Sequence, residues 1–337
     1  MPPIRPIAIY HEHQEWFRPL FAALDARQIR YVRIDARNHQ YDPGKAQQDY
    51  ALVFNRMSPS AYRRGNHGIF YTLGYLAHLE RNGTRVVNGS RAFGFETSKA
   101  AQLSVFTKLG IECPRTRIIN HPAEAPSAAA IIGYPLVVKP NIGGSGAGIA
   151  RYDRAEDLEK AAAEGHLDLG LDQTALVQEF IPARNSSIVR VEVLGGKFLY
   201  AIQIFSTGET FNLCPGHICQ TADGAPLSRS ICPADAPKTG LTVKGVTPPA
   251  EAIATVERIM AAGGIEIGGV EYMVDDRNGG RVFYDVNALS NYVADAPRVV
   301  GFDPYARLAD YLIAEAEKAE AAAEPERRVA VEAGRAR

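Results

Sequence analysis

Residues 134–149 run Tyr-Pro-Leu-Val-Val-Lys-Pro-Asn-Ile-Gly-Gly-Ser-Gly-Ala-Gly-Ile, and this stretch is the most informative part of the sequence. A short apolar run ends at Lys139, and a glycine-rich loop follows it. The backbone N–H groups of such a loop can surround a polyphosphate, while a lysine at the end of a strand supplies a fixed positive charge. A plain flexible turn is the alternative, and the glycines alone do not separate the two hypotheses. The candidate loop residues are Gly143, Gly144, Ser145, Gly146 and Gly148.

The residues after the loop indicate what kind of phosphate site this is. Ile149-Ala-Arg-Tyr152 resumes like a strand, so the loop is expected to close a β-hairpin. A Walker P-loop and a Rossmann turn both lead into a helix. The sequence therefore disfavours both of these nucleotide-binding motifs.

The composition excludes several classes of partner. The 337 residues include 37 basic and 38 acidic side chains, and no basic tract recommends nucleic acid. No stretch has the ~18 uninterrupted apolar residues of a membrane span, and the first residues show no apolar signal core. Four cysteines in a chain of this length do not form a disulfide framework. We expect a soluble, cytoplasmic protein.

The order of strand-like and helix-like segments divides the chain into four parts. Residues 1–95 alternate between the two patterns, which predicts a small parallel sheet with covering helices. Residues 96–173 predict a compact α+β subdomain that carries the glycine loop. Residues 174–315 are rich in strands, and residues 316–337 form an Ala/Glu-rich tail, expected to be either a helical extension or disordered.

Further candidate residues accompany Lys139 along the chain. Lys99 lies near the start of a predicted helix, where its ammonium group and free N–H groups could both reach phosphate. Asp285 and Asn287 alternate on one strand, so their side chains point to the same face, and Glu271 ends another apolar run. Such hard oxygen ligands suit Mg²⁺ bound to nucleotide phosphates. The strand edge at Gln178-Glu-Phe-Ile181 is a candidate adenine hinge.

This ordered set resembles the ATP-grasp superfamily, and within it RimK-like glutamate ligases and relatives of glutathione synthetase. The resemblance covers about residues 86–315, and residues 1–85 match the preceding α/β domain in pattern only. It implies an α/β (α+β) ATP-grasp fold that follows an N-terminal domain with a small parallel sheet.

The resemblance also implies a role for each matched residue. Lys99 and Lys139 should contact the phosphates of ATP, and the glycine loop should close over them. Residues Gln178, Glu179, Phe180 and Ile181 should hold adenine, mainly through the backbone. Asp285, Asn287 and Glu271 should lie at the Mg²⁺, for which Mn²⁺ is an alternative. Arg190 and Asn212 should lie near the transferred phosphate, so that Arg190, Lys139 and Asn212 are the catalytic candidates.

The sequence departs from the family at several positions. The usual Glu-x-Asn is Asp285-Val-Asn287, and the usual Pro-Gly after it is Leu289-Ser-Asn291. The Arg and His that often follow Asn-Leu are replaced by Cys214-Pro-Gly216. A shorter carboxylate can still bind Mg²⁺. The changed loops weaken the inference that the substrate is glutamate.

The activity implied is an ATP-dependent carboxylate–amine ligase. Its small carboxylate and its amine, an amino acid or a peptide, would be joined through an acylphosphate with release of ADP and phosphate. A small-molecule kinase on the same fold and a non-catalytic ATP-binding regulatory module are the alternatives. Relatives are often dimers or tetramers, so a homo-oligomer is also expected.

Three other groups of residues have open interpretations. Cys214, Cys219 and Cys232 lie close in sequence, but their spacing matches no standard structural zinc motif. His11 and His13 follow the first strand, as metal ligands or as solvated loop residues. Arg56, Arg63 and Arg64 follow another strand and are candidates to bind a substrate carboxylate.

Overall fold

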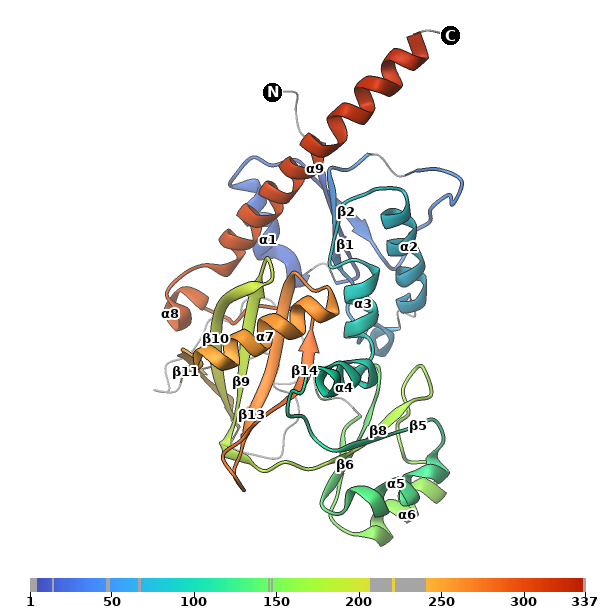
Figure 1. The fold of residues 1–337 in the computed structure, drawn as a ribbon, viewed down its shortest axis with the longest axis vertical. Coiled ribbons are helices and arrows are strands. Elements are labelled where there is room, and N and C mark those ends of the chain that lie inside the picture. The colour runs from blue at the N-terminus through green and yellow to red at the C-terminus, as the bar shows by residue number, and fades with distance from the viewer. Residues whose placement is uncertain are drawn as a thin grey trace.

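The computed structural model describes residues 5–13, 15–46, 49–65, 68–144, 146, 148–206, 220–221 and 241–335. Ser145, Asn212, Cys214, Cys219 and Cys232 lie outside these residues. The described chain forms three sheets, one parallel and two mainly antiparallel, which Figure 1 shows with their covering helices. This agrees with the mixed α/β fold expected from the sequence.

The N-terminal sheet is parallel and has the strand order β2-β1-β3-β4. Ile7 and Ile9 of its central strand pack with α1, whereas Ala8 and Tyr10 pack with α2, so helices cover both faces. Its elements are β1 (Ile7–His11), η1 (Glu15–Phe17), α1 (Arg18–Asp25), β2 (Tyr31–Asp35), β3 (Leu52–Arg56), η2 (Ala61–Arg64), α2 (Ile69–Arg81), β4 (Val86–Val87) and α3 (Ser90–Glu96).

The second sheet is the lid, an antiparallel sheet with the order β5-β8-β6-β7. Strands β6 and β7 form the hairpin expected around the glycine loop. The sequence assigned residues 175–179 to the following subdomain, but as β8 they pair within the lid; the domain boundaries themselves stay a prediction. The lid contains β5 (Thr116–Ile119), η3 (Pro122–Glu124), α5 (Ala125–Ile132), β6 (Leu136–Pro140), β7 (Ala150–Tyr152), α6 (Ala155–Ala163) and β8 (Ala175–Glu179).

The third sheet has six strands in the order β11-β12-β10-β9-β13-β14. One face packs on α4 and α7, and the other packs on the N-terminal sheet and α9. Its elements, with these helices, are α4 (Lys99–Lys108), β9 (Ala183–Leu194), β10 (Lys197–Ser206), β11 (Gln220–Thr221), β12 (Leu241–Val246), α7 (Ala250–Gly263), β13 (Ile267–Asp275), β14 (Arg281–Asn287), α8 (Ala296–Val300) and α9 (Pro304–Arg335).

The connections into and out of the lid run side by side. The chain enters between α4 and β5, and it leaves between β8 and β9. The N–H of Glu179 donates to the carbonyl of Arg115 at 3.0 Å, which joins the two connections. The N–H of Phe283 donates to Glu112, and the N–H of Asp276 donates to Pro182, so both connections are also tied to the β13–β14 hairpin.

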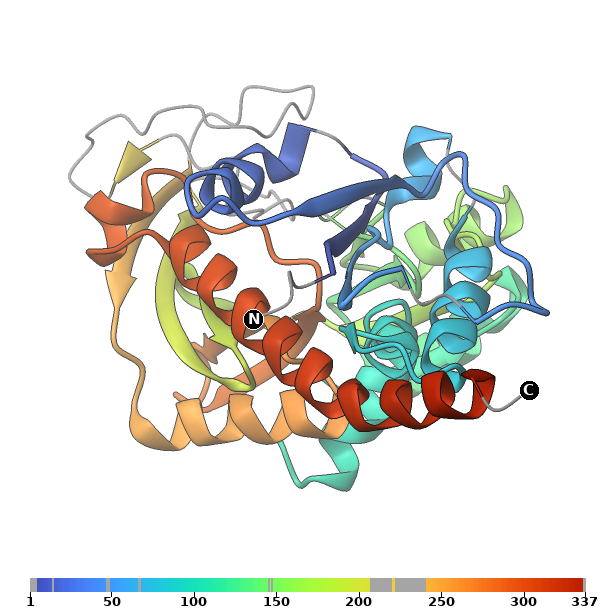
Figure 2. The same ribbon diagram turned by 90° about the horizontal axis from the view of Figure 1, so that it is seen from above.

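Helix α9 returns to the N-terminal sheet, and Figure 2 shows it running across the molecule toward the C-terminus. Leu308, Leu312 and Ala316 are buried against that sheet, and Arg5 donates to Glu320 at 2.5 Å. The predicted tail covers residues 316–337, either as a helical extension or as disordered chain. Its residues 316–335 are part of α9.

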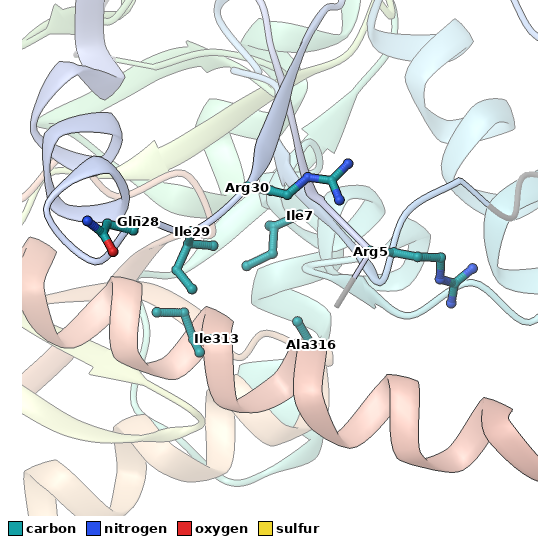
Figure 3. Close-up of a pocket in the computed structure, with 7 residues that line it drawn as sticks. All are labelled: Arg5, Ile7, Gln28, Ile29, Arg30, Ile313 and Ala316. Carbon is teal, nitrogen blue, oxygen red and sulfur yellow. The ribbon is translucent and has the colours of Figure 1, made fainter. Parts of the chain in front are cut away.

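A hollow of about 220 Å³ lies where α9 meets the edge of the N-terminal sheet (Figure 3). Apolar side chains face it from both sides, with two arginines and a glutamine at its rim. It is lined by Arg5, Ile7, Gln28, Ile29, Arg30, Ile313 and Ala316, none of which is a predicted site residue. Among the described helices, none is both long enough and apolar enough to cross a membrane.

Candidate functional site

Strand alternation gathers the predicted polar residues on one face of the six-stranded sheet. Arg190 is paired in register with Glu271, and Glu271 is paired in register with Asp285. The alternate residues of the same strands, such as Val191 and Val270, are buried against α4 and α7. The charged residues therefore lie on three neighbouring strands and face away from that core.

Arg190 and Glu271 form the centre of a buried hydrogen-bond network. Arg190 donates from Nη1 to Glu271 Oε1 at 2.8 Å and from Nε to Glu192 Oε1 at 2.6 Å. The hydroxyl of Tyr284 donates to the other oxygen of Glu271 at 2.7 Å. Burial raises the pKa of Glu271, and the Arg190 charge opposes this. Arg190 thus pairs across the strands with Glu271, and this places it beside the metal candidates.

Lys99 and the Asp285/Asn287 pair are brought together from distant parts of the chain. Lys99 Nζ lies 2.6 Å from Asp285 Oδ1, and Asn287 Nδ2 donates to Asp285 Oδ2 at 3.0 Å. Burial acts to raise the pKa of Asp285, but the ammonium groups of Lys99 and Lys139 outweigh it, so the pKa falls below its ordinary value. Asp285 is therefore anionic at neutral pH.

Lys139 lies at the same site but without a partner of its own. Its side chain is buried at the end of β6, and its ammonium makes no hydrogen bond or ion pair with any residue that the structure describes. Burial, followed by the charge of Lys99, lowers the pKa of Lys139 to about 8, although Asp285 and Glu271 act to raise it. A buried ammonium in this state favours an arriving anion.

The start of α4 differs from the prediction. The sequence suggested free N–H groups beside Lys99, but Ser98 Oγ accepts from Ala101 at 3.2 Å and Asn141 Oδ1 accepts from Ala100 at 2.9 Å. The helix begins at Lys99, after the N-cap Ser98. These two backbone N–H groups are therefore already paired and are not free to meet a phosphate.

The glycine loop is anchored at its start and contacts the N-terminal domain. Asn141 Nδ2 donates to Asp172 at 2.6 Å, and the hydroxyl of Tyr62 donates to the carbonyl of Ile142 at 3.1 Å. At Gly148, where φ is +77°, a Cβ would lie 2.5 Å from an oxygen of Asp168. The positive φ therefore favours glycine at this position, and a side chain there would also displace the ends of the Asp168 and Arg63 side chains.

The side chains of the candidate adenine hinge, residues 178–181, contact other residues of the chain. Gln178 donates to Thr116 Oγ1 at 2.8 Å, and Glu179 accepts from the Arg115 N–H at 2.8 Å. Arg151 stacks on the ring of Phe180 at 4.1 Å. Buried Ile181 follows them. Recognition through the backbone, as the resemblance implies, is compatible with this arrangement.

The donor set at Asp285, Asn287 and Glu271 fits Mg²⁺ chemically. It offers two carboxylates and an amide oxygen, and the Lys99 ammonium already shows that a cation is held at Asp285. Within the described part of the chain no group of three or more His, Cys, Asp or Glu residues could hold a metal by itself. Nucleotide phosphates and water would have to complete the coordination.

Some of the other arginine and histidine candidates already have partners within the chain, and others have polar atoms without a partner in the described structure. Arg63 pairs with Asp168 of the lid at 2.8 Å, and Arg64 pairs with Glu12, so both already bind carboxylates of the chain. His13 stacks on Trp16, 4.3 Å between ring centroids. Arg56 and His11 are different, because both are buried at the carboxyl edge of the parallel sheet.

Several residues of the site were not singled out from the sequence. Glu192 and Ser290 complete the Arg190 network, since Ser290 Oγ donates to Glu192 at 2.5 Å and accepts from Arg190 Nη2 at 3.2 Å. Buried Glu96 accepts from the Leu289 N–H at 2.7 Å, and burial raises its pKa to about 7. Strand alternation could have found Glu192, two residues after Arg190; the loop and helix residues carried no signal.

Comparison with known proteins agrees with this geometry. The model of the RimK-like ATP-grasp domain family matches residues 96–246. A probable alpha-L-glutamate ligase of Enterobacter sp. (strain 638) is 30% identical over 189 residues, which are 55% of this chain and 61% of the relative. A ribosomal protein bS6–L-glutamate ligase of Salmonella paratyphi B has the same identity and coverage. The chain thus spans about three fifths of the length of the curated relatives it matches.

Solved structures extend the likeness over most of the chain. A RimK domain ATP-grasp protein from Sphaerobacter thermophilus has a TM-score of 0.64 at 23% identity, covering 91% of this chain and 98% of the other. D-alanine–D-alanine ligase from Bacillus anthracis has a TM-score of 0.63 at 19% identity, covering 93% and 97%. The ATP-grasp ligase PsnB, complexed with a phosphomimetic variant of its minimal precursor, Mg and ADP, has a TM-score of 0.65 at 19% identity, covering 93% and 99%.

The fold of most of the chain is similar to that of ATP-grasp ligases. Within that class, the chain carries a RimK-like ATP-grasp domain.

Proposed function

We propose that this protein is an ATP-dependent carboxylate–amine ligase that joins a small carboxylate to an amino acid or peptide amine. The observation that carries the proposal is the cluster of Lys99, Asp285 and Asn287, with the unpartnered ammonium of Lys139 beside it. A cation-and-carboxylate site of this composition suits nucleotide phosphates bound with a metal. The names of the relatives support ligation as the reaction.

In the proposed reaction a substrate carboxylate oxygen attacks the γ-phosphorus of ATP, and the bond to the β-phosphate oxygen breaks. Lys139 and Lys99 bind the phosphates, and Arg190 neutralises charge on the transferring group. The glycine loop covers the site and excludes water from the acylphosphate. The amine then attacks the acyl carbon, phosphate leaves, and the amine loses a proton.

The proposal assigns the remaining positions as follows. Mg²⁺, or Mn²⁺ in its place, would be held by Asp285, Asn287 and Glu271 and would offset the negative charge of the phosphates. Adenine would be held by the backbone of residues 178–181, and Gly143, Gly144, Ser145, Gly146 and Gly148 would cover the phosphates. Asn212 near the γ-phosphate, the cytoplasmic location and a homo-oligomer stay predictions.

The test is incubation with ATP, Mg²⁺ and pools of amino acids and small peptides, with ADP, phosphate and new masses measured together. We expect phosphate release with a condensed product, and a loss of about 10²- to 10³-fold in kcat for Lys139→Met and Asp285→Asn. Lys197→Met, which removes an exposed ion pair with Glu257, is the matched control and should keep full activity.

Three outcomes would contradict the proposal. A phosphorylated product without phosphate release would indicate a kinase. Tight ATP binding without ADP formation from any pool would indicate a regulatory module. Full activity in both site variants would show that the cluster is not the nucleotide site.

A further inference from the structure

Arg56 is the most deeply buried arginine described, and most of its hydrogen-bonding capacity is unused. It ends β3 and is 2% exposed. Its Nη2 donates to the carbonyl of Ser290 at 2.7 Å, but Nε and Nη1 have no hydrogen-bond partner within the described residues. Buried guanidinium N–H groups without partners are costly, so a partner absent from the protein chain is expected.

Other polar atoms without partners surround this guanidinium. His11 is paired in register with Arg56 across β1 and β3 and is equally buried. Neither of its ring nitrogens makes a hydrogen bond of normal geometry in the described structure, although the backbone of His13 lies nearby. The hydroxyl of buried Tyr292, close enough for the Arg56 charge to act on its pKa, is also unpaired there.

The local charges leave Arg56 available to an anion. The carboxylates whose charge acts on the pKa of Arg56 are those of Glu96 and Glu192. Glu192 is bonded to Arg190 and Ser290, and Glu96 is bonded to the Leu289 N–H. Burial lowers the pKa of His11 to about 4, so at neutral pH His11 offers a neutral N–H and adds no second charge.

Arg56 is linked to the proposed reaction site through a single residue. Ser290 accepts from Arg56 with its carbonyl and from Arg190 with its hydroxyl, at 2.7 and 3.2 Å. The two guanidinium groups therefore lie within about 10 Å of each other by covalent geometry. One small molecule can span that distance, with its reacting group at Arg190.

The shape of the guanidinium also favours a carboxylate. The Ser290 carbonyl occupies one hydrogen of Nη2. The other Nη2 hydrogen, together with a neighbouring unpartnered nitrogen, forms an edge that a carboxylate can bind through two parallel hydrogen bonds. Phe17 and Phe54 lie 4.7 and 5.3 Å from the guanidinium carbon, which fixes its plane.

Resting on the proposed ligase function, we propose that Arg56 binds a non-reacting carboxylate of a substrate, with His11 and Tyr292 donating to the same group. The substrate class is then an amino acid or peptide whose second carboxylate lies a few bonds from its reacting group. That carboxylate belongs either to the acid that is phosphorylated or to the amine, and the experiment separates these sources.

The experiment compares wild type with Arg56→Met and Arg56→Lys. Arg33→Met is the matched control, because Arg33 lies in the same sheet and stacks on Phe21 at 4.5 Å but is exposed. In Arg56→Met we expect KM for one carboxylate-bearing substrate to rise about 10- to 100-fold, with KM for ATP unchanged. A rise confined to the acid or to the amine identifies the source. Arg56→Lys should recover part of the loss.

A binding measurement makes the test independent of turnover. The shift in Tm caused by each of the twenty L-amino acids, and by its α-amide, is recorded with ADP and Mg²⁺ present. We expect an acid that stabilises wild type, its amide that does not, and no shift in Arg56→Met. Without added ligand Arg56→Met should keep or raise Tm, because an unpaired buried charge has been removed.

The outcomes separate this inference from the proposed function. Turnover in wild type with unchanged KM values in Arg56→Met leaves the ligase standing and overturns the carboxylate site. Carboxylate binding that depends on Arg56, without ADP formation, retains the site and contradicts the ligase. No turnover and no Arg56-dependent binding contradict both.

Discussion

Lys139 shows how one buried side chain can limit the stability of the folded protein. Its ammonium is enclosed near Lys99, and the carboxylates of Asp285 and Glu271 only partly compensate for the loss of water. Proteins retain such unfavourable groups where a ligand supplies the missing interaction. An ATP phosphate would supply it here.

The stability of the ligand-free protein should therefore depend on the titration of Lys139. The pKa is about 8 in the folded state and higher in the unfolded state, so between these values the unfolded chain binds more protons. Below pH 8 the cost of the buried ammonium is fully present, and it is relieved as the pH rises above 8. We expect Lys139→Met to flatten the rise in unfolding free energy between pH 7.5 and pH 9.5, measured in urea.

An equal pH dependence in wild type and Lys139→Met would contradict this assignment. Lys197→Met serves as the control, because Lys197 is exposed and pairs with Glu257. Its profile should follow that of wild type.

At the scale of elements, the site depends on an amide that joins two of them. Asn141 begins the glycine loop, accepts from the first turn of α4 and donates to Asp172. The loop that should cover the phosphates and the helix that carries Lys99 are thus positioned by the same side chain.

Asn141→Ala should lower the unfolding free energy by about 1–3 kcal/mol, because it removes the three hydrogen bonds of the Asn141 side chain, with Ala100, Ser98 and Asp172. It should also raise KM for ATP several-fold. Ser98→Ala removes the N-cap bond to Ala101 and a long bond of 3.4 Å to Asn141, but it keeps the bonds of Asn141 to Ala100 and Asp172, so it should cost about 1 kcal/mol and leave KM for ATP nearly unchanged. Urea unfolding and steady-state kinetics measure the two effects. Similar KM values in both variants would show that Asn141 does not position the loop.

Much of the site could be predicted because it follows from short-range periodicity. Alternation along β14 places Asp285 and Asn287 on one face, and the glycines between β6 and β7 predict a hairpin. The capping of α4 by Asn141 and the bridging of Arg56 and Arg190 by Ser290 could not be predicted. These bonds join residues 41 to 234 positions apart, and such pairs have no local pattern.

At the scale of the whole molecule, the N-terminal and six-stranded sheets share one hydrophobic core, whereas the lid has its own. Arg85 reinforces the shared part. It precedes β4 and binds Glu266, which leads into β13, and Glu315 of α9, the latter at 2.7 Å. Tyr311 also donates to Glu266, at 2.6 Å.

Arg85→Met should destabilise the protein by about 2–4 kcal/mol, because partly buried Glu266 loses its cation and Glu315 keeps only the exposed ammonium of Lys318. Arg154→Met removes an exposed ion pair with Asp157 and should leave the unfolding free energy nearly unchanged. Urea denaturation of both variants checks the difference. A cost for Arg85→Met no larger than that of Arg154→Met would show that this junction adds nothing to stability.

Because both connections of the lid lie side by side, the lid is one continuous segment, and this affects the order of folding during synthesis. The strands and helices of the lid come from one uninterrupted segment, residues 116–179, and so does its core. The N-terminal sheet, although translated first, has α1 on one face, but the cover of that face is complete only when the six-stranded sheet and α9 are made. Domains fold as their segments become available, so we expect the lid to fold on the ribosome while the earlier sheet waits for the last helix.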